Sequence, residues 1–258
     1  MLNLTKSVLS CVSLSTVLSL GACGDTESQF RQTAQFSQAS EDEMESVAMM
    51  VELASLASVG IPLVAFIVAG FSENGCPAIT ETGVVGNGCV ASDGSRYEGS
   101  LELVENEVDG FSSVIYRGFR FPGPEFAFYM DGSVVFTQES AETVRYDLAL
   151  TVEIQLEPGA EPRRGEAEMS AICDVLEGGG TARCTLEAGS AAKVDGLGGF
   201  TMEGVHGLGF PSGETNDSNA SDVLIQGAES LHYVYDGGAE CYTYTIEGGE
   251  PQRSCKGE

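Results

Sequence analysis

One stretch of thirteen residues, Arg145–Glu157, constrains the fold more than any other part of the chain. Apolar side chains occupy every second position in it: Tyr146, Leu148, Leu150, Val152, Ile154 and Leu156. A period of two places these side chains on one face of a β-strand and leaves the other face largely polar. We therefore expect a sheet with one face in a core and the other toward solvent.

Asp-Gly pairs punctuate the chain from residue 93 onward, at 93–94, 109–110, 131–132, 195–196 and 236–237. An Asp-Gly pair between alternating runs is a strong hairpin signal. The clearest case is Asp131-Gly132, which stands between Phe126–Met130 and Ser133–Thr137. Short turns join antiparallel strands. The spacing of these signals predicts an antiparallel meander of roughly ten to thirteen strands.

A helix is expected before the strands. Ser40 followed by Glu43 fits a capping box, and the acids of Glu41–Glu43 suit the positive end of a helix dipole. The helix should run from about Glu41 to Ser58, before Gly60 and Pro62.

The chain has no charged residue from Leu53 to Phe71, which raises a transmembrane alternative. A span there would place Cys23 and the later cysteines on opposite sides of a membrane, although all of them need the same oxidising space. A helix buried against a sheet is therefore preferred. The predicted fold class is mainly β: a curved antiparallel meander sheet or partial barrel, packed on one N-terminal apolar helix.

The N-terminus carries a targeting signal. Lys6 precedes the apolar segment Ser7–Leu20, which ends in Leu20-Gly21-Ala22-Cys23. This stretch resembles bacterial lipoprotein signal peptides, and all four lipobox positions match. The resemblance implies cleavage before Cys23, acylation of that cysteine with palmitate-type chains, and a lipid anchor in the membrane. Gly24 implies sorting to the outer membrane. The alternatives are an ordinary secretory signal and a spanning helix, for which the segment is short.

The expected organisation has four parts. Residues 1–22 form the signal peptide, 23–40 a flexible tether, 41–72 the apolar helical segment, and 73–258 an antiparallel β domain. Removal of the signal peptide leaves 236 residues, enough for one large domain.

The charge of the chain excludes one class of partner. The mature part would hold 11 cations against 39 acids, and its lysines would be Lys193 and Lys256. Binding of nucleic acid requires a basic face, so it is excluded as a partner, and docking on anionic lipid head groups is disfavoured. A solvated acidic surface is preferred over a dedicated cation-binding surface.

Six cysteines remain after Cys11 leaves with the signal and Cys23 is acylated. They form three local pairs that each bracket a glycine-containing turn: Cys76 and Cys89, Cys173 and Cys184, Cys241 and Cys255. An even number of cysteines in an exported chain indicates disulfides, and the spacing predicts three stapled hairpins. A zinc site is the alternative, but no Cys-x-x-Cys pair is present.

The run Cys76–Ser100 combines a Cys-Pro start, a second cysteine, a Ser-Asp-Gly turn, an aromatic residue and a strand of small residues. It resembles a pattern in lipoproteins of myxobacteria and their relatives. The resemblance extends the lipoprotein assignment but implies no activity.

No nucleophile elbow, Walker A loop, dinucleotide fingerprint or His-Glu-x-x-His motif is present. We interpret His206 and His232 as structural or surface residues. The run Asp217–Asp222 resembles a calcium loop but lacks the glycine and glutamate of an EF-hand, so we expect a polar loop. No catalytic residue, metal or cofactor is therefore assigned.

Three functions follow as hypotheses. The first is a non-catalytic structural or binding module, lipid-anchored in the bacterial envelope. The second is a carrier that holds an apolar ligand between sheet and helix, suggested by Phe119, Phe121, Phe126 and Phe128. The third is a hydrolase using acidic residues, because 39 acids make close carboxylate pairs inevitable.

Overall fold

The computed structural model describes residues 30–58, 75–92, 94–106, 111–122, 127–140, 142–155, 161–174, 183–207, 220–236 and 241–255. These residues form a 3-10 helix η1 (Phe36–Gln38), one α-helix α1 (Glu41–Ser58) and fifteen strands. The strands are β1 (Ala78–Thr80), β2 (Gly83–Val85), β3 (Cys89–Val90), β4 (Arg96–Asn106), β5 (Phe111–Pro122), β6 (Ala127–Gln138), β7 (Thr143–Gln155), β8 (Arg163–Asp174), β9 (Arg183–Leu186), β10 (Ala191–Val194), β11 (Gly198–Gly207), β12 (Ser221–Gln226), β13 (Ser230–Asp236), β14 (Cys241–Ile246) and β15 (Gln252–Cys255).

All of these strands belong to one antiparallel meander. The order across the sheet is β1-β2-β4-β5-β6-β7-β8-β10-β11-β12-β13-β14-β15, with β3 added beside β4. The predicted fold class is confirmed. The strand number exceeds the predicted range because β1, β3 and β9 have only three, two and four residues. Strands this short carry no periodic signal.

Strands β9 and β10 together occupy one position in the sheet. Both pair with β8 on one side and β11 on the other. Residues 187–190, which connect β9 to β10, face only Met169 and Ser170 of β8. The connection is therefore a bulge that separates β9 from β10. The buried Ser190 fastens the bulge, since its hydroxyl donates to the Ser170 carbonyl at 3.0 Å.

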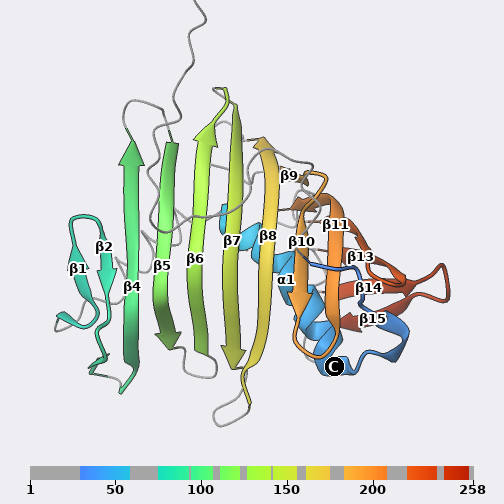
Figure 1. Cartoon of the computed structure of the whole chain (residues 1–258), viewed down its shortest axis with the longest axis horizontal. Coiled ribbons are helices and arrows are strands. Elements are labelled where there is room, and N and C mark those ends of the chain that lie inside the picture. Colours follow the sequence, from blue (N-terminus) through green and yellow to red (C-terminus); the bar gives the residue numbers. More distant parts are fainter. Residues whose placement is uncertain are drawn as a thin grey trace, which may run out of the picture.

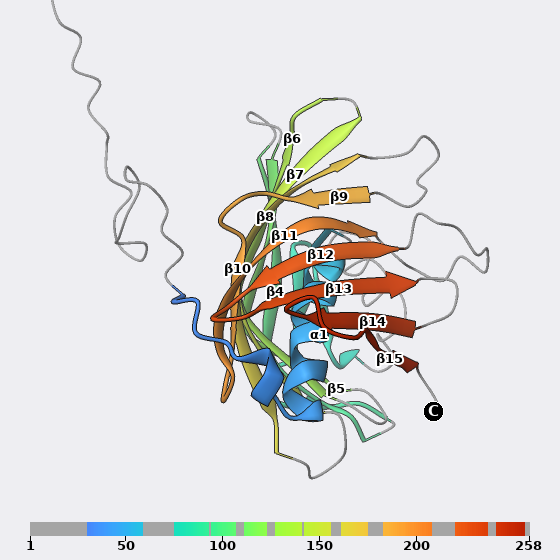
Figure 2. The ribbon, with the colours of Figure 1, turned by 90° about the vertical axis from the view of Figure 1, so that its right-hand side faces the viewer.

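The sheet curves around α1. In Figure 1 the long strands β4–β8 run vertically, β13–β15 run across that direction, and α1 lies behind β8 and β10. Figure 2 shows the same sheet from the side, bent into a partial ring with α1 inside the bend. We call the side of β4–β8 and β10 that faces α1 the inner face, and the opposite side the outer face.

The alternation predicted for 145–157 is confirmed over the described residues of β7. Tyr146, Leu148, Leu150, Val152 and Ile154 are all at most 5% exposed and belong to the single core that the inner face shares with α1. Leu156 lies outside the described residues. The odd-numbered side chains of β7 point to the outer face.

The hairpin predicted at Asp131-Gly132 is wrong. Both residues lie in the middle of β6, which continues without a turn from Ala127 to Gln138. The pair lies opposite a bulge in β5, where the two residues Arg117 and Gly118 face the single residue Asp131. The Gly118 amide donates to Asp131 Oδ1 at 2.8 Å, so the carboxylate binds the backbone group that the bulge leaves out of the ladder.

Two of the other Asp-Gly positions do lie in turns between strands, as predicted. Asp195-Gly196 forms the turn between β10 and β11. Gly94 lies in the turn between β3 and β4, where the Gly94 amide donates to the carbonyl of Ala91 at 3.0 Å. Residues 109–110 and Gly237 lie outside the described part of the chain.

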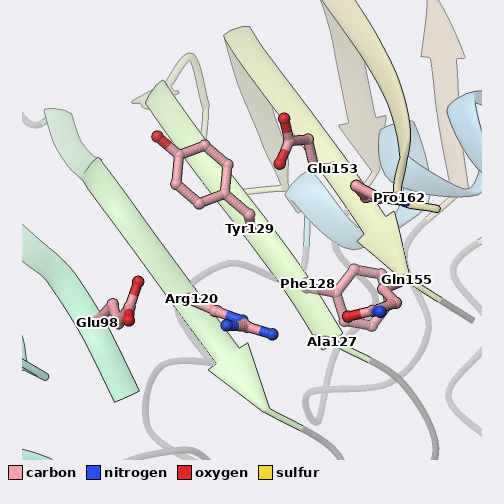
Figure 3. A pocket seen from close by; sticks show the side chains of 8 residues that line it. All are labelled: Glu98, Arg120, Ala127, Phe128, Tyr129, Glu153, Gln155 and Pro162. Carbon is pink, nitrogen blue, oxygen red and sulfur yellow. The ribbon is translucent and has the colours of Figure 1, made fainter. Parts of the chain in front are cut away.

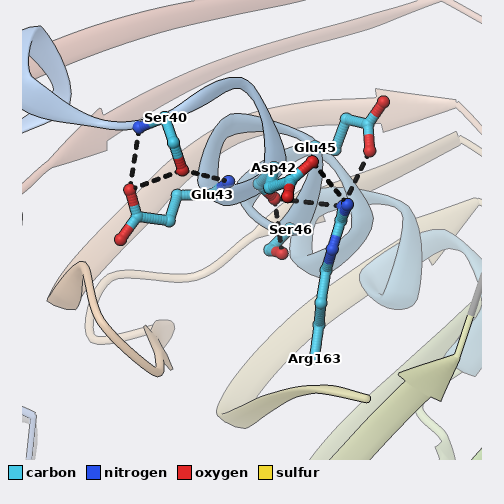
Figure 4. Close-up of polar contacts among 6 residues, drawn as sticks. All are labelled: Ser40, Asp42, Glu43, Glu45, Ser46 and Arg163. Atoms are coloured by element: carbon cyan, nitrogen blue, oxygen red, sulfur yellow. Dashed lines mark hydrogen bonds and ion pairs between the residues drawn. The ribbon is translucent and has the colours of Figure 1, made fainter. Parts of the chain in front are cut away.

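Helix α1 has the predicted bounds and the predicted cap. The Ser40 amide donates to Glu43 Oε2 at 2.8 Å, and the Glu43 amide donates to Ser40 Oγ at 3.3 Å, which completes a reciprocal capping box (Figure 4). The Ser40 amide and the Ser40 hydroxyl both donate to the Glu43 carboxylate at 2.8 Å, and these two hydrogen bonds lower its pKa.

An arginine of the sheet holds the first turn of the helix. Arg163 at the start of β8 binds Asp42 Oδ1 and Glu45 Oε2, each at 2.7 Å, and the Asp42 carbonyl at 3.1 Å (Figure 4). Further along the helix, fully buried Met50 packs on β8 where Gly165 has no side chain. A Cβ at Gly165 would lie 2.3 Å from the Met50 methyl carbon.

Residues 30–40 pack against the sheet before the helix begins; we call them the strap. The amides of Thr33 and Ala34 donate to the Gly199 carbonyl at 2.9 and 3.1 Å, and the Ala34 carbonyl accepts from Ala228 at 2.9 Å. Phe36 is 1% exposed and contacts Phe200 edge-on. The part of the predicted tether that the structure describes is thus packed on the β domain.

Two of the three predicted disulfides join side chains that the structure describes. Cys76 bonds Cys89 across the β1–β2 hairpin, and Cys173 bonds Cys184, its direct ladder partner on β9. The third pair is aligned, because Cys241 of β14 lies opposite Cys255 of β15. The side chain of Cys255 lies outside the described residues, so that disulfide stays a prediction.

No helix among the described residues is long and apolar enough to cross a membrane. The signal peptide, Cys23 and residues 59–74, with most of the uncharged stretch 53–71, lie outside them.

Candidate functional site

A row of polar side chains crosses the outer face of the sheet. Five residues on neighbouring strands are successive ladder partners: Glu98 of β4, Arg120 of β5, Tyr129 of β6, Glu153 of β7 and Arg164 of β8. Neighbouring strands are about 4.8 Å apart, so the row spans about 19 Å. We call these five residues the outer row.

The outer row lines a shallow hollow of about 280 Å³. Glu98, Arg120, Tyr129 and Glu153 border it, and Figure 3 shows these side chains rising from four adjacent strands. Gln155 and Pro162 close one end. The hollow is open to solvent rather than enclosed, so it suits the protruding side chains of a partner better than a small molecule that must be surrounded.

The outer row includes two arginines that make no ion pair with the described residues, Arg120 and Arg164. Other cations on the same face are paired: Arg96 with Glu98 of the outer row at 2.9 Å, Arg117 with Glu102 at 3.3 Å, and Arg145 with Glu139 at 2.6 Å and with Glu187. Hydrogen bonds to these two glutamates raise the pKa of Arg145. Arg120 and Arg164 are therefore the cations of this face available to an external carboxylate.

A different cluster forms on the curled end of the sheet. Tyr233 and Tyr235 of β13 lie opposite Tyr244 and Tyr242 of β14, and all four pack on the core. The Tyr242 ring stacks on the rings of Tyr233 and Tyr244 at 6.0 and 6.2 Å between centroids. Desolvation by burial, together with Tyr242 and Glu41 nearby, raises the pKa of Tyr244. This cluster stabilises the contact between the curled end and the rest of the core.

The described cysteines that were predicted as site residues stabilise the fold through disulfides. Cys173 and Cys184 are buried at the inner face, whereas Cys89 joins the small β1–β3 segment to Cys76. Cys23 lies outside the described residues, so its lipidation remains a prediction.

The structure describes the side chain of one of the two histidines, His232. His232 Nε2 lies 2.7 Å from Asp222 Oδ1 on the exposed side of β12 and β13. Across the ladder, His232 faces Thr245 of β14. The backbone of His206 pairs with Cys184, but the side chain of His206 is not described.

The structure also bears on the metal and calcium expectations. Within the ten described ranges, no group of three or more His, Cys, Asp or Glu side chains could hold a metal ion. The end of the predicted polar loop, Ser221-Asp222, begins β12. Residues 217–219 lie outside the description.

The space between sheet and helix is occupied by side chains. Val47, Met50 and Val51 of α1 are at most 1% exposed, and the helix contacts β7, β8, β10 and β11 directly. Phe119 is fully buried and Phe128 packs on the same core. The hollow at the outer row and a second hollow of about 210 Å³ beside Phe30 and Glu168 lie away from this interior.

Sequence reasoning did not identify the outer row. Its residues are ordinary polar positions of alternating strands, and they align only because two bulges shift the register. One bulge lies at Gly99 between Glu98 and Ser100, and the other between Tyr116 and Phe119. Gly99 and Gly118, which lie in these bulges, are the only sequence signal that could have indicated the register shifts.

Comparisons with models of known protein families, with curated proteins and with solved structures found no match for this chain.

Proposed function

We propose that this chain is a lipid-anchored protein of the bacterial envelope, sorted to the outer membrane, whose β domain acts without catalysis as a structural or binding module. The observation that carries the proposal is the lipobox Leu20–Cys23, preceded by Lys6 and an apolar segment. The disulfides Cys76–Cys89 and Cys173–Cys184 support an oxidising compartment outside the cytoplasm.

The strap supports an anchor that keeps the domain close to the membrane. Phe30 is buried and the following residues are hydrogen-bonded to β11, so at most residues 24–29 separate the proposed anchor from the packed domain. Seven residue steps separate Cys23 from Phe30. A fully extended chain of that length reaches about 25 Å. A binding module held so near a bilayer would meet partners at the membrane surface.

A binding role is favoured over a carrier role. The packing of Met50 on Gly165 brings α1 against the strands without room for a ligand at that point. The outer face, in contrast, carries Arg120 and Arg164 without ion pairs to described residues, together with an open hollow.

The test is metabolic labelling with radioactive palmitate of cells that express the full chain. Wild-type protein should incorporate the label and fractionate with the outer membrane. Cys23→Ala should abolish labelling and leave a longer precursor, and globomycin should have the same effect on the wild type. Cys11→Ala is the matched control and should not alter labelling. A wild-type protein that is processed but carries no acyl chain would overturn the anchor.

A further inference from the structure

The charges of the outer row are ordered in a particular way. From β4 to β8 they read negative, positive, neutral, negative, positive: Glu98, Arg120, Tyr129, Glu153 and Arg164. Reversing this order about its centre exchanges every negative residue with a positive one. Glu98 then takes the place of Arg164, and Arg120 takes the place of Glu153.

A two-fold axis parallel to β6 performs this reversal. If the axis lies between two sheets that face each other, it inverts the order of strands and keeps the row at the same height. We propose that the outer face is the interface of a symmetric homodimer. In it, Arg120 pairs with Glu153 of the second copy, Glu98 pairs with Arg164 of the second copy, and the two Tyr129 rings meet at the axis. Such an interface is isologous, the commonest arrangement in soluble oligomers.

The outer face is large enough for this interface. Strands β4–β8 have 11 to 13 residues each and lie side by side in the sheet. With about 3.3 Å per residue and about 4.8 Å per strand, they present roughly 950 Å² on one side. A standard protein interface buries about 800 Å² on each partner.

The distribution of charge over the chain also favours this face for contact between two copies. A chain of net charge −27 repels its own copies at most orientations. The outer face along β4–β8 and β10 is much less acidic than the rest of the chain, since these strands hold six of the chain's 12 cations and eight acids, and Glu139 and Glu187 beside Arg145 add two more acids. The residues on the strands are Arg96, Arg117, Arg120, Arg145, Arg164 and Lys193, and Glu98, Glu102, Asp131, Asp147, Glu153, Glu166, Glu168 and Asp174.

Glu98 already binds Arg96 of its own strand at 2.9 Å, so Arg164 of the second copy would share Glu98 with that contact. Phe30 of the strap also lies on this face, beside Asp131 and Glu166, so the second copy would meet this side chain as well.

The same axis has a further, unfavourable consequence. It brings Glu102 toward Glu168 of the second copy and sets the two Asp131 side chains near the axis. Glu102 is already paired with Arg117 at 3.3 Å, and Asp131 Oδ1 is bound by the Gly118 amide. These existing contacts offset part of the repulsion, and the Arg120–Glu153 pairs occur twice in the dimer.

Charge reversal tests the pairing directly. The full chain is purified in detergent, and its self-association is measured by sedimentation velocity over a range of protein and salt concentrations. Wild-type protein should form a dimer that weakens as salt rises. Arg120→Glu places two like-charged contacts in each dimer, and should weaken association by about 100-fold or more.

The double variant Arg120→Glu/Glu153→Arg restores opposite charges by symmetry, and should dimerise like the wild type. Arg253→Glu on β15 is the control, because it changes the net charge equally at the far end of the sheet. Circular dichroism verifies that each variant is folded. A monomeric wild type, an Arg120→Glu variant that still dimerises, or a double variant that remains monomeric would overturn the proposal. The readout does not require acylation of Cys23, so it stands apart from the test of the anchor.

Discussion

Three glycines on neighbouring strands, Gly99, Gly118 and Gly132, adopt positive φ angles of 65°, 56° and 124°. Each lies at or opposite a bulge, and together they let β4, β5 and β6 change direction at the same height. Two of them also have no room for a side chain: a Cβ would lie 2.1 Å from the Gly118 carbonyl oxygen at Gly99, and 2.1 Å from the Ala149 carbonyl oxygen at Gly132. The curvature of this sheet therefore depends on the absence of a Cβ at Gly99 and Gly132.

Gly132→Ala should reduce the free energy of unfolding by about 4 kcal/mol, because backbone strain and a clash with a backbone oxygen add together. Gly189→Ala is the control, since Gly189 has a φ of 97° with nothing within 4 Å of its would-be Cβ. The control should lose only about 1–2 kcal/mol, the strain alone. Urea unfolding measures both, and equal losses would contradict the steric argument.

At the scale of elements, the strap shows how a polar segment becomes part of a fold. Its amides bind a single carbonyl of β11, and Gly199 and Gly227 leave space for its backbone. A Cβ at either glycine would lie within 2.5 Å of a strap carbonyl oxygen. Glu229, in the turn before β13, then accepts hydrogen bonds from the Ser37 amide at 2.7 Å and the Ser37 hydroxyl at 2.6 Å.

These contacts make attachment of the strap dependent on pH. The hydrogen bonds from Ser37 lower the pKa of Glu229 from its ordinary value of 4.5. A lowered folded-state pKa means that the stabilisation is complete above the ordinary value and is lost as pH falls through the lowered one. The protection factor of the Ser37 amide, which compares its exchange rate with that of an unstructured amide at the same pH, should therefore fall as the pH drops below about 4.5.

Glu229→Gln should remove this pH dependence, because an amide does not titrate in this range, and should leave a lowered protection factor at Ser37 that no longer changes with pH. Glu203→Gln on the exposed side of β11 is the matched control and should keep the wild-type profile. A wild-type Ser37 amide whose protection is unchanged by acid would contradict the assigned role of Glu229.

On the scale of the whole molecule, sheet and helix share one hydrophobic core. Residues of α1, such as Val47 and Met50, belong to the same cluster as side chains of β5, β7 and β12. The sheet curls so far that β13 and β14 contribute the tyrosine cluster to the same core. Helix and sheet should therefore unfold together.

Met50→Ala tests whether helix and sheet unfold together. Loss of a fully buried methionine should cost about 2–5 kcal/mol, and exchange should accelerate in α1 and β8 alike, because both border the cavity. Met49→Ala, at the half-buried neighbouring position, should cost clearly less. The measurements are thermal unfolding and hydrogen exchange by mass spectrometry. Exchange that rises in α1 while β8 stays protected would show two separate units.

The sequence alone determined the local features of this protein. The alternation in β7 predicted its buried face, because a strand presents successive side chains to opposite sides wherever it lies. Ser40 and Glu43 predicted the start of α1, because a capping box involves only four consecutive residues. Cys173 and Cys184 were paired correctly, because a short hairpin brings its own ends together.

The tertiary structure alone decided features that depend on distant parts of the chain. Asp131-Gly132 has the local chemistry of a turn, but a bulge in β5 and the pairing with β7 keep it within a strand. The strap has a polar composition, yet β11 and Glu229 supply its hydrogen-bond partners from more than 160 residues away. The outer row likewise arises from the register of five strands, so its charge order becomes visible only once the sheet is assembled.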